Sequence, residues 1–238
     1  MLFDKIGAID PHHPDTWQDK IFITVDIDWA CDTVIDLTLD LLVEHNKKAT
    51  IFTTHESESI NRIKELSNFE IGIHPNFNPL LQGKFDYGNT YEKVLDKFRS
   101  IHRHSTAIRS HSMVQSSVLL NTFSNMGFTH DCNTFVPFSS GVELAPWTHW
   151  NSSLIKVPYF WEDDIHCISG WEWDLDKLVR HPGLKVFDFH PIHVYLNTHD
   201  IELYESTRSL HNTPSMLAGK VNRTEYGTRD LFLDLLSI

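Results

Sequence analysis

The first part of the chain alternates between two hydrophobic spacings, one typical of strands and the other typical of helices. An apolar, β-branched run over residues 20–27 predicts a buried strand, and residues 49–55 form a second such run. The intervening residues 31–48 place apolar side chains at helical spacing: Val34, Ile35, Leu39, Leu42 and Val43. The pattern therefore predicts a strand, a helix and a second strand.

The same alternation continues through the rest of the chain. Further strands are predicted over residues 69–75, 106–111, 128–135, 153–161 and 184–196. Further helices are predicted over residues 57–66, 91–103, 116–126 and 228–238. Strands that alternate with helices favour a parallel sheet covered by helices, although the pattern leaves open whether the sheet closes into a barrel. Because no repeat or linker divides the sequence, we expect a single domain over residues 1–238.

Composition narrows the class of protein and its partners. Hydrophobic residues make up 41% and charged residues 22% of the chain, which is typical of a globular protein. The formal net charge is −12, and no Lys/Arg cluster offers a path for phosphates, so we expect neither nucleic acid nor an anionic membrane as a partner. The N-terminus lacks a leader pattern and no apolar run is long enough to span a bilayer, so we expect a cytoplasmic protein without a membrane span.

Polar residues gather at the carboxyl ends of the predicted strands. Asp26 and Asp28 share one face of an extended strand, because side chains alternate with period two. Five more polar residues end the later strands: His74, Arg109, His111, Asp188 and His190. Any one of them alone has a structural explanation, such as an ion pair or a satisfied turn. Their repetition on four strands indicates one cleft, since catalytic groups of α/β folds lie at this edge.

Five segments together resemble the NodB-homology polysaccharide deacetylases, carbohydrate esterase family 4. They read TVDID, EIGIHPNFN, IRSHS, VPYFWEDD and LKVFDFHPIH, in this order, between residues 21 and 193. The resemblance implies a distorted, incompletely closed (β/α) barrel. It also implies a divalent metal and a carbohydrate substrate.

The resemblance assigns roles to individual residues. Asp26 would be the general base, Arg109 would orient it, and His190 would be the general acid. Asp28 and His74 would hold the metal together with Asn78, which stands where the family has its second histidine. Five residues are further candidates for contacts with the substrate or with these groups: His111, Trp161, Asp163, Asp164 and Asp188. Asp163, Asp164 and Asp188 are alternative partners that would fix the tautomer of His190.

The metal and the substrate are predicted only as classes. Imidazole, carboxylate and amide donors suit Zn²⁺ but also Ni²⁺, Co²⁺ or Mn²⁺. Residues four apart on one helical turn face the same way, so we expect His74 and Asn78 to reach the same ion. His111 is an alternative third ligand.

The primary functional hypothesis is a metal-dependent hydrolase that removes an N-acyl group, acetyl in the first instance, from an amino sugar or a polysaccharide precursor. A second hypothesis is hydrolysis of another amide, formyl or ureido, on the same scaffold. A third is a carbohydrate-binding protein that has kept the fold and lost catalysis. The sequence leaves the sugar, the acyl group and the oligomeric state open.

Overall fold

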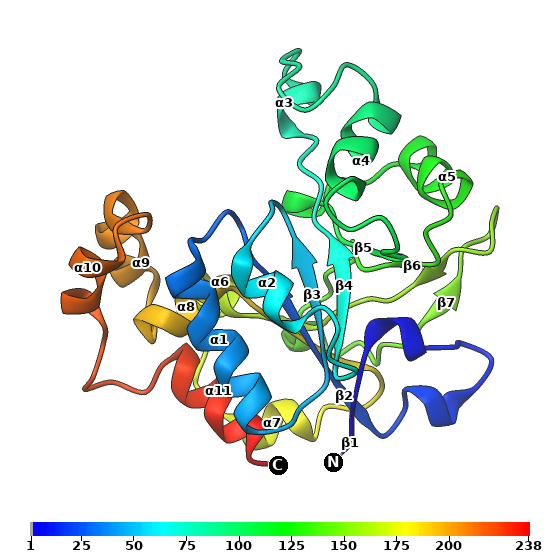
Figure 1. The fold of residues 1–238 in the computed structure, drawn as a ribbon. Coiled ribbons are helices and arrows are strands. Elements are labelled where there is room, and N and C mark those ends of the chain that lie inside the picture. The colour runs from blue at the N-terminus through cyan, green and yellow to red at the C-terminus, as the bar shows by residue number, and fades with distance from the viewer. Residues whose placement is uncertain (1) are drawn as a thin grey trace.

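The fold is built around one curved sheet, seen here in a computed structural model that describes residues 2–238 (Figure 1). Its strands are β1 (Leu2–Asp4), β2 (Lys20–Asp26), β3 (Ala49–Thr53), β4 (Phe69–Ile73), β5 (Ala107–Ile108), β6 (His130–Asp131), β7 (Trp147–Thr148), β8 (Ile155–Lys156), β9 (Trp161–Glu162) and β10 (Lys185–Phe189). Neighbouring strands follow the order β7-β8-β6-β5-β4-β3-β2-β10-β9, and β1 pairs with β2 off this path. All pairs are parallel except β7 with β8.

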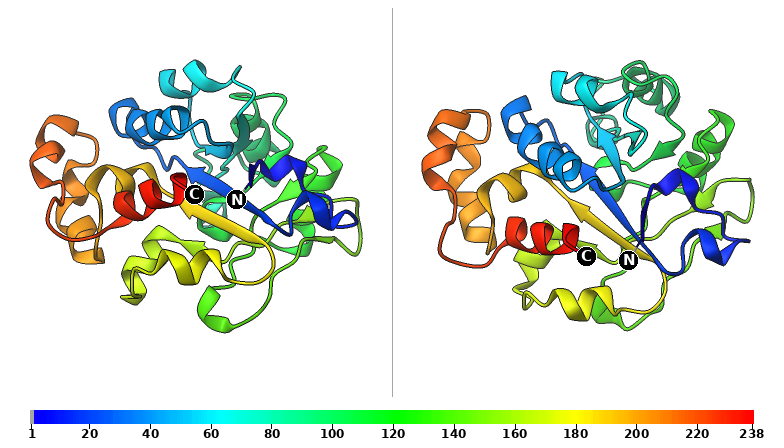
Figure 2. Two further views of the ribbon diagram at one scale, coloured as in Figure 1. Left: turned by 90° about the horizontal axis from the view of Figure 1, so that it is seen from below. Right: turned by 60° about the horizontal axis from the view of Figure 1, so that its bottom comes forward.

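The sheet curls without closing. Among the described strands, β7 and β9 end the path and form no ladder with each other. The view from below shows helices around the outside of the curled strands (Figure 2). A parallel sheet that curls with helices outside and leaves two strand edges unpaired confirms the predicted distorted, incompletely closed (β/α) barrel (Figure 2).

Helices cover the outside of the sheet and follow the strands in sequence. The α-helices are α1 (Asp32–Glu44), α2 (Glu58–Ile63), α3 (Asn78–Leu81), α4 (Tyr91–Arg99), α5 (Ser117–Asn125), α6 (Asp163–Ser169), α7 (Leu175–Val179), α8 (Pro191–Leu196), α9 (Ile201–Thr207), α10 (Pro214–Leu217) and α11 (Thr228–Leu236). Short 3₁₀ turns lie at Ile6–Ala8, Pro14–Thr16, His111–Met113, Phe138–Ser140, Arg208–Leu210 and Ala218–Lys220. Within residues 2–238, every helix is too short or too polar to traverse a bilayer.

Local sequence explains where several helices begin and what they bury. The side-chain oxygens of Ser57, Thr90 and Ser116 accept hydrogen bonds from the first turns of α2, α4 and α5. Such caps satisfy amide groups that have no partner within the helix. Helix α1 buries apolar residues at the predicted spacing, including Val34, Ile35, Leu39 and Leu42. The first predicted helix is therefore confirmed.

Two predicted strands are partly wrong. Residues 153–161 form two short strands, β8 and β9, in place of one. Residues 184–196 were predicted to be extended throughout, but β10 ends at Phe189 and α8 begins at Pro191. Proline suits the first turn of a helix, because its φ is already helical and its missing N–H needs no partner there. The helix turns the chain sharply away from the sheet and leaves His190 at the carboxyl edge.

Candidate active site

The two acids of the first motif come from the end of β2 and from the turn that follows. Asp26 is the last residue of β2 and is buried, whereas Asp28 has a φ of 36° and is partly exposed. Trp29 also has a positive φ, 56°, which L-residues rarely adopt. The strand therefore does not extend to Asp28 as predicted. The strained turn instead directs the Asp28 carboxylate toward the ends of β4 and β5.

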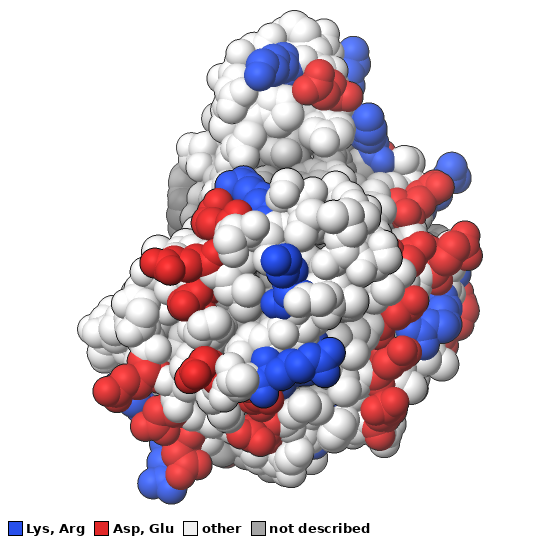
Figure 3. All heavy atoms as spheres, turned by 90° about the vertical axis from the view of Figure 1, so that its left-hand side faces the viewer, with Lys and Arg blue, Asp and Glu red and all other residues white. Residues whose placement is uncertain are grey.

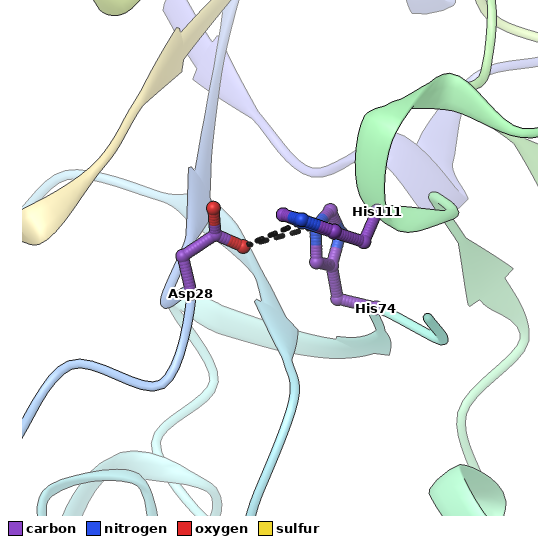
Figure 4. A group of neighbouring side chains, drawn as sticks. All are labelled: Asp28, His74 and His111. Atoms are coloured by element: carbon purple, nitrogen blue, oxygen red, sulfur yellow. Dashed lines mark hydrogen bonds and ion pairs between the residues drawn. The ribbon is translucent and has the colours of Figure 1, made fainter. Parts of the chain in front are cut away.

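Three side chains converge at this edge (Figure 4). The Oδ1 atom of Asp28 lies 3.2 Å from Nε2 of His74 and 3.2 Å from Nδ1 of His111. The two histidine nitrogens are 3.3 Å apart. His74 follows β4 and is buried, and His111 follows β5 in a 3₁₀ turn that contains two left-handed residues, Ser112 and Met113.

This group fits a divalent ion of the size of zinc. Ligand atoms at about 2.0–2.1 Å from a tetrahedral zinc ion are about 3.3 Å apart, which matches the three separations between Asp28, His74 and His111. Burial opposes ionisation of Asp28, but hydrogen bonds with His111 and His74 hold its pKa well below the usual range. The carboxylate is thus ready to bind a cation. Nickel, cobalt and manganese accept the same donor types, so the donors do not select one metal.

Asn78 lies outside this group. It is the first residue of α3, and residues 75–77 form no helix, so the expectation that it shares a helical turn with His74 is wrong. Its side-chain nitrogen donates a hydrogen bond to Oγ of Ser112, at 3.1 Å. Ligation of an ion by Asn78 stays a prediction. The geometry favours His111 as the third donor.

Asp26 lies in a buried cluster of charges centred on Arg109. Nη1 of Arg109 donates to Oδ1 of Asp26 at 3.0 Å, to Oγ1 of Thr24 at 3.0 Å, and to Oδ1 of Asp188. The guanidinium lies over the ring of Tyr159, 4.4 Å from its centroid. Burial raises the pKa of Asp188 to about 7 although Arg109 opposes the change. One guanidinium therefore holds two carboxyl groups, of which Asp26 faces the smaller cavity at the site.

Asp163 holds the ring of His190 next to Asp28. Oδ1 of Asp163 lies 2.7 Å from Nδ1 of His190, and Oδ2 accepts the backbone N–H of His190, also at 2.7 Å. The other nitrogen, Nε2, lies 3.7 Å from Oδ2 of Asp28. Burial opposes protonation of His190, but Asp163 raises its pKa well above the usual value. Of the three alternatives, Asp163 is the partner that fixes the ring, since Asp188 is bound to Arg109.

Two cavities meet at these residues. The smaller one has a volume of about 140 Å³ and contains Asp26 and Arg109, and the larger one has a volume of about 460 Å³. Four residues line both: Asp28, His111, Asp164 and His190. Trp161, predicted as a pocket wall, is instead fully buried in the core, where its indole N–H donates to His166. Its strand position turns the indole away from the cleft.

The smaller cavity is also lined by two titratable residues that were not among the predicted site residues, Tyr159 and Glu162. The Tyr159 hydroxyl donates to Oε2 of Glu162 at 3.2 Å. Burial raises the pKa of Glu162 well above its usual range, and the nearby acids Asp164 and Asp188 reinforce the shift. Glu162 directly precedes the two predicted aspartates, so its place in the run of acids was the available signal.

A comparison with protein families covers all the site residues described above. A family model described as WbmS-like polysaccharide deacetylase matches residues 23–208. The chain belongs to this family. The resemblance to polysaccharide deacetylases is therefore confirmed, and it places the chain among carbohydrate deacetylases.

A solved structure at 40% identity agrees with the WbmS-like assignment. A polysaccharide deacetylase from Bordetella bronchiseptica, described as involved in O-antigen biosynthesis, is 40% identical and superposes with a TM-score of 0.93 over 99% of this chain and 97% of that chain. A polysaccharide deacetylase from Mycobacterium smegmatis is 14% identical, with a TM-score of 0.48 over 86% of this chain and 94% of that chain. Comparison with curated proteins finds no match.

Proposed function

We propose that this WbmS-like protein is a metal-dependent hydrolase that removes an N-acetyl group from an amino sugar or a polysaccharide precursor. The observation that carries the proposal is the convergence of Asp28, His74 and His111 between an acid held by Arg109 and a histidine held by Asp163. Hydrolysis of an amide needs groups of these kinds on both sides of the scissile bond. The B. bronchiseptica relative, described as involved in O-antigen biosynthesis, supports a role in surface polysaccharide synthesis. We place the protein in the cytoplasm.

A bound divalent ion would acidify the attacking water and polarise the amide carbonyl. Asp26 accepts the proton of the attacking water as the water oxygen bonds to the acyl carbon, and Arg109 holds the carboxylate where it faces the smaller cavity. His190 donates a proton to the nitrogen as the C–N bond breaks, so the amine leaves neutral. Oδ1 of Asp163 accepts the Nδ1–H of His190 and stabilises the imidazolium form, which carries on Nε2 the proton that is donated.

We assign His111 as the third metal ligand in place of Asn78. The Nδ1 atom of His111 is within 3.3 Å of both other donors, whereas the Asn78 amide is engaged with Ser112. A histidine from the end of β5 thus supplies the donor that the family takes from the second motif. We therefore expect His111→Ala to lower metal affinity at least tenfold and Asn78→Ala to leave it within about threefold.

The test combines metal analysis with turnover. Purified wild type and both variants are incubated with Zn²⁺, desalted and analysed for bound metal, and acetate release from N-acetylglucosamine oligomers is measured in parallel. Asp26→Asn is the matched control for the chemistry, because it should keep the metal and lose about 10²–10⁴-fold in turnover. Loss of metal from Asn78→Ala with retention in His111→Ala would show that the ligand assignment is wrong.

The two other hypotheses predict different outcomes of the same test. An enzyme for another amide would bind about one equivalent of metal and release formate or ammonia, but no acetate, from the corresponding N-formyl or ureido sugar. A carbohydrate-binding protein without catalysis would bind sugar and retain no metal after the incubation. Either result would refute the deacetylase assignment.

A further inference from the structure

The larger cavity extends from the candidate metal group toward the segment that carries α8 and α9. Its volume of about 460 Å³ is in the range of about 300–1,000 Å³ usual for small-ligand pockets, whereas the smaller cavity, at about 140 Å³, is below it. Helices α8, α9 and α10 lie together at one side of the molecule (Figures 1 and 2). A substrate that reacts beside His190 can therefore place an acyl group in the smaller cavity and its larger part against these helices.

One wall of this cavity contains a buried histidine that the proposed reaction does not use. His193 on α8 is 2% exposed, and its Nδ1 atom is buried without a hydrogen-bond partner among residues 2–238. Burial, with His190 nearby, holds the pKa of His193 well below its usual value, so the ring is neutral. A buried polar atom without a partner costs roughly 1–3 kcal/mol. An apolar ring of the same shape would avoid this cost. The second nitrogen, Nε2, is not among the buried atoms and has no hydrogen-bond partner among residues 2–238, so it is the nitrogen that a ligand in the cavity can reach.

The neighbouring side chains define what kind of ligand fits. The Tyr204 ring, which also lines the cavity, stacks face to face on His193 with an interplanar angle of 15° and a centroid distance of 4.6 Å, so it covers one face of the imidazole. Trp29 lines the same cavity. Flat rings beside a hydrogen-bonding group suit a ligand that has both apolar faces and hydroxyl groups.

The charges around the cavity do not favour an anion. Apart from Asp28 and the histidines, the charged side chains of its wall are two carboxylates, Asp164 and Glu205, and one guanidinium, Arg208. Nη1 of Arg208 lies 3.4 Å from Oε2 of Glu205. On the face of the molecule drawn in Figure 3, Lys and Arg are interspersed with Asp and Glu. This face therefore has no broad positive field that would attract a polyanion.

We infer that this cavity binds a neutral, hydroxyl-bearing sugar ring, and that His193 determines its specificity through a hydrogen bond to one hydroxyl group. The inference rests on the proposed function, because that function sets which end of the substrate lies beside His190. His193 acts on recognition and does not touch the reacting atoms. Its stacking partner Tyr204 fixes the plane of the imidazole.

The experiment measures binding of N-acetylglucosamine by saturation-transfer NMR, in the presence of a chelator so that no metal contributes. His193→Phe keeps the ring and its stacking but removes both nitrogens. We expect binding to weaken roughly three- to tenfold, the equivalent of one net hydrogen bond, while the melting temperature stays equal or rises. A purely structural role for His193 would instead lower the melting temperature and leave sugar affinity unchanged.

His102→Phe is the matched control, because His102 also has a buried nitrogen, Nε2, without a partner among residues 2–238, and lies outside both cavities of the site. Equal affinities of wild type and His193→Phe, or equal losses in both variants, would overturn the inference. So would failure of the wild type to bind N-acetylglucosamine, or tighter binding of N-acetylglucosamine 6-phosphate. The proposed function fails separately, if the wild type retains no metal or releases no acetate.

Discussion

Replacing Arg109 by methionine tests whether the buried charge cluster is held by one guanidinium. Arg109 is 1% exposed and donates to Asp26 and Asp188, which are both buried. Arg109→Met keeps most of the side-chain volume but leaves two carboxyl groups without their cation. Breaking a buried pair by removing one partner costs about 3–5 kcal/mol, so we expect a loss of that size in the free energy of unfolding at pH 8.

The assay is urea denaturation followed by tryptophan fluorescence, with Arg62→Met as the control. Arg62 also pairs with two aspartates, Asp36 at 3.0 Å and Asp40 at 2.7 Å, but it is 45% exposed. Exposed pairs of this kind contribute about 0–1 kcal/mol, because water screens them. In the Arg109→Met background, Asp188→Asn should recover part of the loss, since one uncompensated charge is removed. Equal losses for Arg109→Met and Arg62→Met would refute the reasoning.

Two further predictions concern stability. The pKa of Asp188 is about 7 in the folded protein and about 3.9 in an unfolded chain, so the folded state binds more protons between these values. The free energy of unfolding should therefore fall as pH rises from 4 to 7, by up to about 1.4 kcal/mol per pH unit. Asp188→Asn should flatten this slope in urea titrations at a series of pH values. An unchanged slope would contradict the raised pKa of Asp188. Gly72→Ala should lower the free energy of unfolding by about 1–3 kcal/mol in the same assay, because a Cβ atom there would lie 2.5 Å from Cδ1 of Phe52 and 3.1 Å from the Ala107 carbonyl oxygen. An unchanged free energy of unfolding would mean that Phe52 moves freely.

Strand ends could be predicted from sequence because period-two patterns state which residues share a face. This is why Asp26, His74, Arg109 and His190 were each assigned to one edge of the sheet, where the structure brings them together. Their repetition along the chain gave more information than any single motif. The parallel order of the strands then follows from the alternation with helices.

The choice between Asn78 and His111 as the proposed third metal donor could not be made in the same way. Spacing alone suggested a helical turn from His74 to Asn78, but the chain reaches α3 only at Asn78, after three residues without helix. The position of His111 depends on left-handed residues in its turn, Ser112 and Met113, which no periodicity reveals. The wall around His193 was missed because the segment after β10 was expected to be extended.

The place of β10 between β2 and β9 has a consequence for synthesis of the chain on the ribosome. Thr24 of β2 hydrogen-bonds to Phe187 of β10 across 163 residues of sequence. Until β10 emerges, one edge of the apolar strand β2 lacks the partner that covers it, and such open edges recruit other chains. The nascent protein therefore depends on late strand insertion, and slow translation between β4 and β10 would prolong the interval in which it can aggregate.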